Sequence, residues 1–396
     1  MASPPASPPA LPPAVRGLGW TSFLTDLSSE AIYPLLPAFI RSLGGTSVEI
    51  GLGDGLANAV AAVARLPAGV ASDRIGRRPL VLLGYGLSAL VRPVMGLVWA
   101  PAGVILVRAA DRLGKGIRSA PRDALVADLT APEIRGRAFG HIRALDHAGA
   151  ALGPLAASLF LFAFPDRLRT LFLLTLLPGL ATLAVIWRCV HDVPGRAAGA
   201  HARPPAARLT RRQGILLVAV GLWALGASSE QFLLLRAGEL GVPAALVPLV
   251  WLGVSIAKSA AAVVAGRFTD RRHPAAVLAA GWLLFAAAYA GLATSGQLAT
   301  TLPLLAAVGV AYGLAEPAER ALVAALAPAG GAGGAFGWYA FAQGVMALPA
   351  GLLAGWLWAR GPHGAGLAFA ATAALALAAC GLLAGVGRLT DSRTAG

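Results

Sequence analysis

The chain has 396 residues, of which 57% are hydrophobic and 13% are charged, and its formal net charge is +14. An ordinary soluble domain carries about 25% charged residues, so this composition excludes most soluble classes. The basic residues are spread along the chain and not gathered in one soluble module, so the net charge does not indicate a nucleic-acid-binding protein.

The chain opens with a proline-rich, uncharged segment that lacks the basic start and apolar core of a secretory signal. We expect residues 1–14 to be a disordered tail that stays attached to the protein.

Apolar runs long enough to span a bilayer, about 20 residues each, follow one another from Arg16 to Val386. We find twelve, centred near residues 30, 60, 90, 112, 150, 178, 225, 255, 285, 312, 345 and 372. They are rich in Leu, Ala and Gly and lack the alternating pattern of membrane strands. The predicted fold class is therefore all-α integral membrane, with twelve transmembrane helices and the lipid bilayer as a partner. Cys189 and Cys380 lie in apolar helical context and indicate neither a disulfide nor a metal site.

Basic residues concentrate in alternate breaks between the apolar runs. Positive charge favours the cytoplasmic side of a membrane, so both termini and the long central loop are expected in the cytoplasm. The basic breaks contain Arg74, Arg77 and Arg78; Arg135 and Arg137; five arginines between Arg196 and Arg212; Arg267, Arg271 and Arg272; Arg388 and Arg393.

The longest interior polar segment runs from His191 to Gln213 and divides the runs into six and six. We predict a six-helix bundle over residues 15–190, a cytoplasmic linker over 191–213, a second bundle over 214–388 and a tail over 389–396. The halves also repeat each other. Residues 69–74 and 266–271, 123–127 and 320–324, and 138–140 and 335–337 are similar at a displacement of 197 residues.

Two six-helix repeats joined by a cytoplasmic loop are the plan of the major facilitator transporters, and three motifs resemble that family. Residues 69–79, GVASDRIGRRP, are similar to its signature between the second and third helices. Residues 112–120 resemble its fourth-helix pattern, with Lys115 where glutamine is common. Residues 149–154, GAALGP, resemble the Gly-x-x-x-Gly-Pro pattern of the antiporter branch.

The resemblance implies a cytoplasmic latch. In the family, the residues that match Asp73 and Arg77 contact each other, often with an acidic residue at the end of the fourth helix, here Asp128. We expect this latch to close the outward-facing state and to release in the inward-facing one; the alternative is that the arginines mark topology alone. The signature also includes Gly69, Arg74 and Gly76, and Asp270 is its counterpart in the second half.

The antiporter-type motif consists of Gly149, Gly153 and Pro154. Small residues at this spacing let membrane helices pack closely, and proline bends a helix, so a purely structural role is the alternative. In the resembling family the motif marks antiporters, usually exporters, and efflux is therefore favoured.

The fourth run carries five basic residues on one helical face. At 100° per residue, Arg108, Arg112, Lys115, Arg118 and Arg122 fall within about 120°. A charge at mid-membrane costs about 2.5 to 3.5 kcal/mol, so these side chains must face water or acidic partners. Some are expected to be structural ion pairs. Arg112, Lys115 and Arg118, together with Lys258, predict a path for a small anionic substrate, for which Arg and Lys are the natural ligands. Asp146 and His147 are further candidates there.

Carboxyl groups in the same path suggest proton coupling, because a buried carboxyl can take up and release a proton near neutral pH. Protons are therefore an expected second partner. The candidates are Asp26, Glu30, Glu230 and Glu316. Trp338 and Tyr339 are weaker candidates for substrate contact.

The sequence thus predicts a monomeric secondary active transporter of the inner or plasma membrane, without a cofactor or catalytic residues. Proton-coupled efflux of an anionic solute or drug is the leading interpretation, and proton-coupled import of an anionic metabolite is its alternative. From other classes, a phosphate-binding membrane transferase and a sensor without flux remain alternatives.

Overall fold

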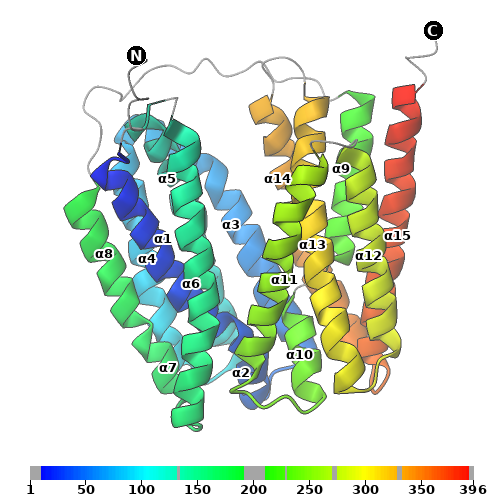
Figure 1. Cartoon of the computed structure of the whole chain (residues 1–396). Coiled ribbons are helices and arrows are strands. Elements are labelled where there is room, and N and C mark those ends of the chain that lie inside the picture. Colours follow the sequence, from blue (N-terminus) through cyan, green and yellow to red (C-terminus); the bar gives the residue numbers. More distant parts are fainter. Residues whose placement is uncertain are drawn as a thin grey trace, which may run out of the picture.

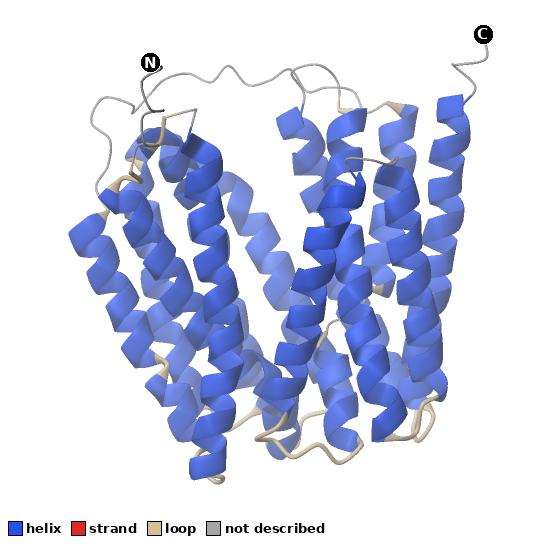
Figure 2. Cartoon of the chain, in the orientation of Figure 1, coloured by secondary structure: helices blue, strands red, loops and turns tan. Residues whose placement is uncertain are grey.

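The computed structural model describes residues 10–131, 134–190, 210–227, 230–269, 274–327 and 332–391. Every regular element among these residues is a helix, and no strand occurs in them (Figure 2).

The first half consists of ten helical pieces that make six crossings. They are α1 (Pro13–Ile32), η1 (Tyr33–Leu35) and α2 (Leu36–Ser42); α3 (Ser47–Ile75); α4 (Arg77–Val94) and η2 (Met95–Leu97); α5 (Pro101–Leu129); α6 (Arg135–Ala163); and α7 (Leu168–Leu174) with α8 (Leu176–Cys189).

The second half has seven helices and again six crossings. They are α9 (Arg211–Gly226) with α10 (Gln231–Glu239), α11 (Val247–Thr269), α12 (Pro274–Thr294), α13 (Leu298–Leu326), α14 (Ala332–Trp358) and α15 (Gly364–Asp391). Ten crossings are long and apolar enough to span a membrane by composition alone. The other two, α1–α2 and α5, carry the charges of the predicted path. The all-helical membrane fold is confirmed.

Three crossings of the first half and the first crossing of the second half are interrupted, and the break in α1 has a clear cause. Pro34 lies in η1, and proline cannot donate the backbone hydrogen bond that a continuous α-helix needs. Discontinuous membrane helices commonly line a binding site, because their freed backbone groups and kinked ends face the interior. The break places Glu30 and Tyr33 at the end of α1, near the middle of its crossing.

Three helix bounds differ slightly from the sequence prediction. α1 begins at Pro13, since proline is well suited to the first turn of a helix. α9 begins at Arg211, because Thr210 and Gln213 form a capping box there, so the last residues of the predicted linker are helical. α15 extends to Asp391, three residues into the predicted tail. Residues 1–9 and 191–209 lie outside the described residues.

The internal repeat is visible in the helix packing. A Cβ atom added to Gly116 would lie 2.6 Å from the carbonyl oxygen of Ala61, and one added to Gly313 would lie 2.2 Å from that of Lys258. Both members of this second pair are displaced by 197 residues from the first. The close approach of Gly84 to the carbonyl oxygen of Gly114 recurs in the same way, as the approach of Gly281 to that of Ala311. The repeat therefore reflects the same helix contacts made twice, with glycine or a small residue where backbones approach closely.

The two halves meet mainly along α3 and α14, on the side away from the chain ends. Figure 1 shows them converging on that side and spreading apart toward the side where α1 begins and α15 ends. A Cβ atom on Gly51 would lie 1.9 Å from the carbonyl oxygen of Gly351, and Ser47 donates a hydrogen bond of 2.9 Å to the carbonyl oxygen of Gly355. Farther along α3, toward the chain ends, Leu66 is largely exposed. Glycine thus sets how closely the halves approach.

Replacing Gly351 with leucine should weaken this contact. The added side chain has no room against Gly51, and overpacking costs about 1 to 3 kcal/mol. We expect a lower melting temperature for detergent-purified Gly351→Leu. The matched control is Gly381→Leu, since nothing lies within 4 Å of a Cβ atom added there. Equal melting temperatures for the two variants would contradict this assignment.

Candidate functional site

The basic residues of α5 contact three different helices. The side chains that periodicity places on one face of α5 therefore do not share one environment. Arg108 pairs with Asp54 of α3 at 3.1 Å, and its guanidinium lies 4.7 Å from the ring centre of Tyr33. This pair is deeply buried. Arg108 therefore holds α5 against α3 and η1.

Arg118 and Arg122 are also engaged within the first half. Arg118 is buried against α4, where it donates to Ser88 at 2.9 Å and lies over the ring of Tyr85. Arg122 donates to Ser22 of α1 at 3.0 Å and pairs with the adjacent Asp123. Arg122 is therefore paired with a carboxylate inside the first half, whereas Arg118 contacts a hydroxyl and a ring but no carboxylate among the described residues.

A further buried pair joins α4 and α5. Arg92 pairs with Asp111 at 2.8 Å, and it donates to the Ser28 hydroxyl and to the carbonyl oxygen of Thr25 at 3.2 Å. The guanidinium is thus bonded to α1 and α5 from α4. Its surroundings are those of a structural ion pair, because its charge is matched inside one bundle.

Arg112 and Lys115 differ from the other basic residues of α5. Arg112 is 9% exposed, its Nε atom is buried without a partner, and it makes no hydrogen bond or ion pair with the described residues. The acidic groups whose charges act on it are Asp111, Glu30 and Asp54. Lys115 is exposed and makes no ion pair within the same part of the chain. These two cations are the ones that α5 leaves available to a ligand.

The second half supplies facing polar groups. Lys258 of α11 lies 4.0 Å from Glu230, beside the start of α10, and 5.1 Å from the ring centre of Tyr312 on α13. Glu230 and Lys258 are both partly buried. Their separation is at the limit of an ion pair, so this pair is looser than those inside the first half.

Three contacts tie these groups together across the two halves. Trp251 of α11 donates from Nε1 to Glu30 at 2.9 Å, and its ring lies 5.3 Å from that of Tyr33. Gln231 donates to the carbonyl oxygen of Tyr33 at 3.2 Å. We call the whole set the central cluster: Glu30, Tyr33, Asp54, Arg108, Arg112, Glu230, Trp251, Lys258 and Tyr312. It brings ionic and aromatic side chains of both halves together.

Sequence reasoning missed four members of the central cluster, Tyr33, Asp54, Trp251 and Tyr312. Tyr33 follows Glu30 at i+3, a spacing that places both on one helical face, and this signal was available. Asp54 lies alone in an apolar run, which in a membrane helix indicates a buried partner. Nothing in the sequence links Trp251 to Glu30.

The other predicted site residues lie apart from the cluster. Asp146 of α6 lies 3.7 Å from Arg143 and 4.0 Å from Arg122, and His147 beside it is exposed. Glu316 is exposed and pairs with Arg320 at 2.7 Å. Asp26 is partly buried on α1, and no hydrogen bond or ion pair joins it to the described residues.

The predicted latch residues contact one another at the α3–α4 turn. Arg77 donates to Asp73 and to the Ser72 hydroxyl at 2.5 Å, and lies 3.4 Å from Asp128 at the end of α5. The turn itself depends on Gly76, whose φ of 96° favours glycine. All these contacts lie within the first half. Gly69 packs near Ala120 and Arg74 is exposed, whereas Asp270 lies outside the described residues.

The antiporter-type motif packs α6 against α1. Cβ atoms on Gly149 and Gly153 would lie 2.4 and 2.5 Å from the carbonyl oxygens of Phe23 and Leu27. Pro154 is buried within α6, which continues through it. The motif thus brings α6 backbone to backbone with the helix that carries Glu30. Among the described residues, no group of three or more His, Cys, Asp or Glu side chains is arranged to hold a metal ion.

Comparison with known proteins agrees with this architecture. The sequence model of the Major Facilitator Superfamily matches residues 18–347. An uncharacterized MFS-type transporter of Methanocaldococcus jannaschii is 30% identical over 362 residues, which cover 87% of this chain and 88% of that protein. The multidrug resistance protein MdtH of Cronobacter sakazakii is 32% identical over 138 residues, about a third of each chain.

A solved structure shows the same fold. The bacterial homolog of the human lysosomal transporter Spinster, in an inward-facing and unoccupied conformation, superimposes with a TM-score of 0.77. The alignment covers 95% of this chain and 96% of that chain at 15% sequence identity.

Removing one partner of the buried Arg92–Asp111 pair should destabilise the bundle strongly. Asp111→Asn leaves an uncompensated buried guanidinium, which costs about 3 to 5 kcal/mol. The control is Glu316→Gln, which breaks an exposed pair worth about 0 to 1 kcal/mol. We expect the melting temperature of purified Asp111→Asn to fall well below that of Glu316→Gln, and equal values would show that Arg92 does not depend on Asp111.

Proposed function

The chain belongs to the major facilitator superfamily, and from this we propose that it is a secondary active transporter that exports a small anionic organic solute in exchange for protons. Both the family and the fold are those of membrane transporters and not of enzymes. The protein is a multi-pass membrane protein, and we propose that it acts as a monomer in the cell membrane.

The main support for an anionic substrate is Arg112, whose buried guanidinium forms no ion pair with the described residues. A guanidinium that is buried without an ion pair is costly in the membrane unless a ligand or water compensates it. Arginine offers a planar set of donors that fits a carboxylate or a phosphate in two parallel hydrogen bonds. A substrate anion bound between Arg112 and Lys115 would supply the missing partner. Glu30 is held by Trp251 and leaves the guanidinium free.

Alternating access follows from how the halves meet. They are joined along α3 and α14 on the side away from the chain ends and diverge on the other side (Figure 1). If the termini are cytoplasmic, as the arginine distribution predicts, this arrangement is inward-facing. The contacts of Arg77 with Asp73 and Asp128 are formed in it, so the release of the latch that we expected in the inward-facing state is not observed. Rocking of the halves around the central cluster would then expose Arg112 to each side in turn.

Two observations favour export by antiport. The α6 motif at Gly149, Gly153 and Pro154 is of the antiporter type, and the partial matches include multidrug resistance proteins. Glu30 and Glu230 lie in the central cluster, where a proton and a substrate anion would alter each other's binding. Asp26, which has no partner among the described residues, is a further proton-coupling candidate, whereas the exposed Glu316–Arg320 pair is a weaker one.

Screening purified protein for thermal stabilisation by anionic metabolites and drugs tests the substrate class. A ligand at 100 times its Kd stabilises by about 2.7 kcal/mol, and we expect this stabilisation to disappear in Arg112→Gln. Arg360→Gln is the control, because Arg360 lies over Trp356 outside the central cluster. Stabilisation that is equal in both variants would show that Arg112 is not part of the substrate site. With any stabilising compound, flux measurements in proteoliposomes establish the direction of transport.

The latch residues give a second test. Asp73→Asn keeps the size of the side chain but removes the charge that binds Arg77, so we expect export to be abolished while membrane insertion is unchanged. Transport is measured in cells or proteoliposomes with the compound from the screen, and insertion by the amount of protein in the membrane. Full-rate transport by Asp73→Asn would refute a latch role.

A further inference from the structure

One buried carboxyl group lies outside the central cluster and has no cationic partner among the described residues. Glu319 of α13 is 2% exposed. Its neighbour Arg320 points elsewhere and pairs with Glu316 at 2.7 Å.

Three neutral side chains hold this carboxyl group. Trp282 of α12 donates from Nε1 to Oε1 at 3.2 Å. On α14, the Tyr339 hydroxyl lies 2.7 Å from Oε2 and the Gln343 amide nitrogen lies 3.2 Å from the same atom. The amide of Gln343 also donates to the Tyr339 hydroxyl at 3.0 Å. Glu319 therefore joins three helices through one carboxyl group.

This arrangement suits both protonation states. An ionised carboxylate accepts all three hydrogen bonds. A protonated one donates from Oε2 to the Tyr339 oxygen, because a hydroxyl is the one partner that can either donate or accept. Trp282 and Gln343 donate in both cases. Loading and unloading a proton thus requires a reversal of one hydrogen bond and no movement of a helix.

Charged groups on the surrounding helices do not compensate Glu319. α12 and α14 carry no Asp, Glu, Lys, Arg or His. On α11 the described side chains include Lys258, which faces Glu230, and on α10 Arg236 and Glu239 face each other at 3.8 Å. α9 has Arg211 and Arg212 in its first turn. Taken together, these contacts favour a carboxyl group that alternates between neutral and charged forms over a permanent ion pair.

The internal repeat shows that this environment is specific to the second half. At the displacement of 197 residues, Glu319 corresponds to Arg122, Gln343 to Asp146 and Trp282 to Tyr85. In the first half the position holds a cation within reach of two carboxylates, Asp123 and Asp146. In the second half it holds a lone carboxyl group among neutral donors. The same place in the fold has thus changed from an ion-pair site to an uncompensated acid.

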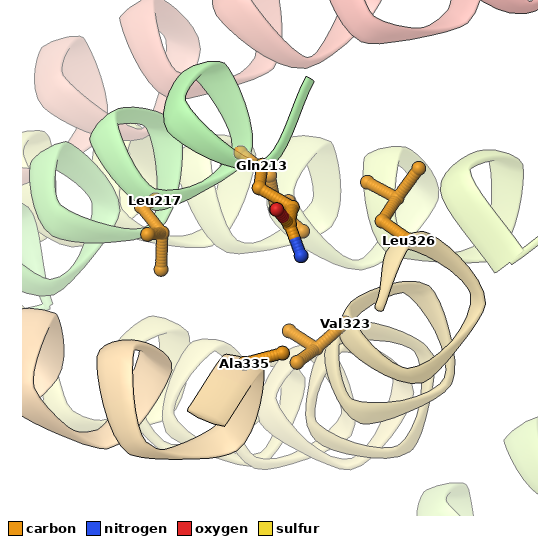
Figure 3. Close-up of a pocket in the computed structure, with 6 residues that line it drawn as sticks. Gln213, Leu217, Val323, Leu326 and Ala335 are labelled. Carbon is orange, nitrogen blue, oxygen red and sulfur yellow. The ribbon is translucent and has the colours of Figure 1, made fainter. Parts of the chain in front are cut away.

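A small pocket lies between α9, α13 and α14 (Figure 3), about one helical turn from this carboxyl group along α13 and α14. Val323 follows Glu319 by four residues and Ala335 precedes Tyr339 by four, so both helices lead from the pocket to the carboxyl group. The pocket has room for about one water molecule. It is lined by Gln213, Leu216, Leu217, Val323, Leu326 and Ala335.

We propose that Glu319 is a proton-binding site, loaded from the side of the chain ends through this pocket. A proton from water adds to Oε2, the carboxylate becomes a neutral acid, and release returns the proton to water by the same path. Its use in coupling rests on the proposed function, but proton binding itself does not.

Infrared difference spectroscopy of the purified protein without substrate tests the site. Lowering the pH should produce several protonated-carboxyl C=O bands in the wild type, and Glu319→Gln should lose the one that belongs to Glu319. Glu316→Gln, one turn away, should keep it. Tyr339→Phe should keep the band but shift its frequency, because the partner of Oε2 is gone, and this variant provides the test if Glu319→Gln does not fold.

The outcomes separate this proposal from the proposed transport. A set of bands in Glu319→Gln that is the same as in the wild type, or a Glu319 band that Tyr339→Phe does not shift, would overturn the proton site. Failure of the anion screen with the band lost in Glu319→Gln would instead contradict the substrate class and leave the proton site supported.

Discussion

The cost of placing charge in hydrocarbon governs this structure. Each charged side chain near the membrane centre costs a few kcal/mol unless it finds water or a partner, and the first crossing and α5 alone carry eight acidic and basic residues from Asp26 to Arg118. Most of these side chains are buried or partly buried between helices and do not face the lipid. Arg92 meets Asp111, and Arg108 meets Asp54, on interfaces between helices that glycines such as Gly116 bring close.

This constraint also explains why the exceptions are informative. Arg112 and Glu319 are buried and charged or chargeable, yet neither forms an ion pair within the described residues. They lie in different halves, and their surroundings differ. Arg112 lies in the central cluster between the halves, whereas Glu319 lies inside the second half among neutral donors. Such groups are the places where a transporter can gain a ligand or a proton without first breaking a strong interaction.

The internal repeat explains how one fold can contain, among the described residues, both an unpaired arginine in its first half and an unpaired carboxyl group in its second half. The same backbone contacts occur inside each half: Gly116 packs on the carbonyl group of Ala61 in the first half, and Gly313 packs on that of Lys258 in the second. The polar side chains on that shared framework differ in sign and in pairing. Close helix packing therefore fixes the scaffold, and the chemistry at equivalent positions is free to diverge.

The sequence by itself determined the helices, their number of crossings and the family, because hydrophobic run length and glycine motifs are local properties of the chain. It also placed Arg77 with Asp73 and Asp128 through a motif. Which members of the α5 face remain unpaired was decided only by tertiary structure. Periodicity gives the direction of a side chain from its helix axis, but the partners of Arg108, Arg118 and Arg122 come from α3, α4 and α1, which are separate helices. Trp251 beside Glu30, and the neutral surroundings of Glu319, likewise depend on how helices from separate segments pack.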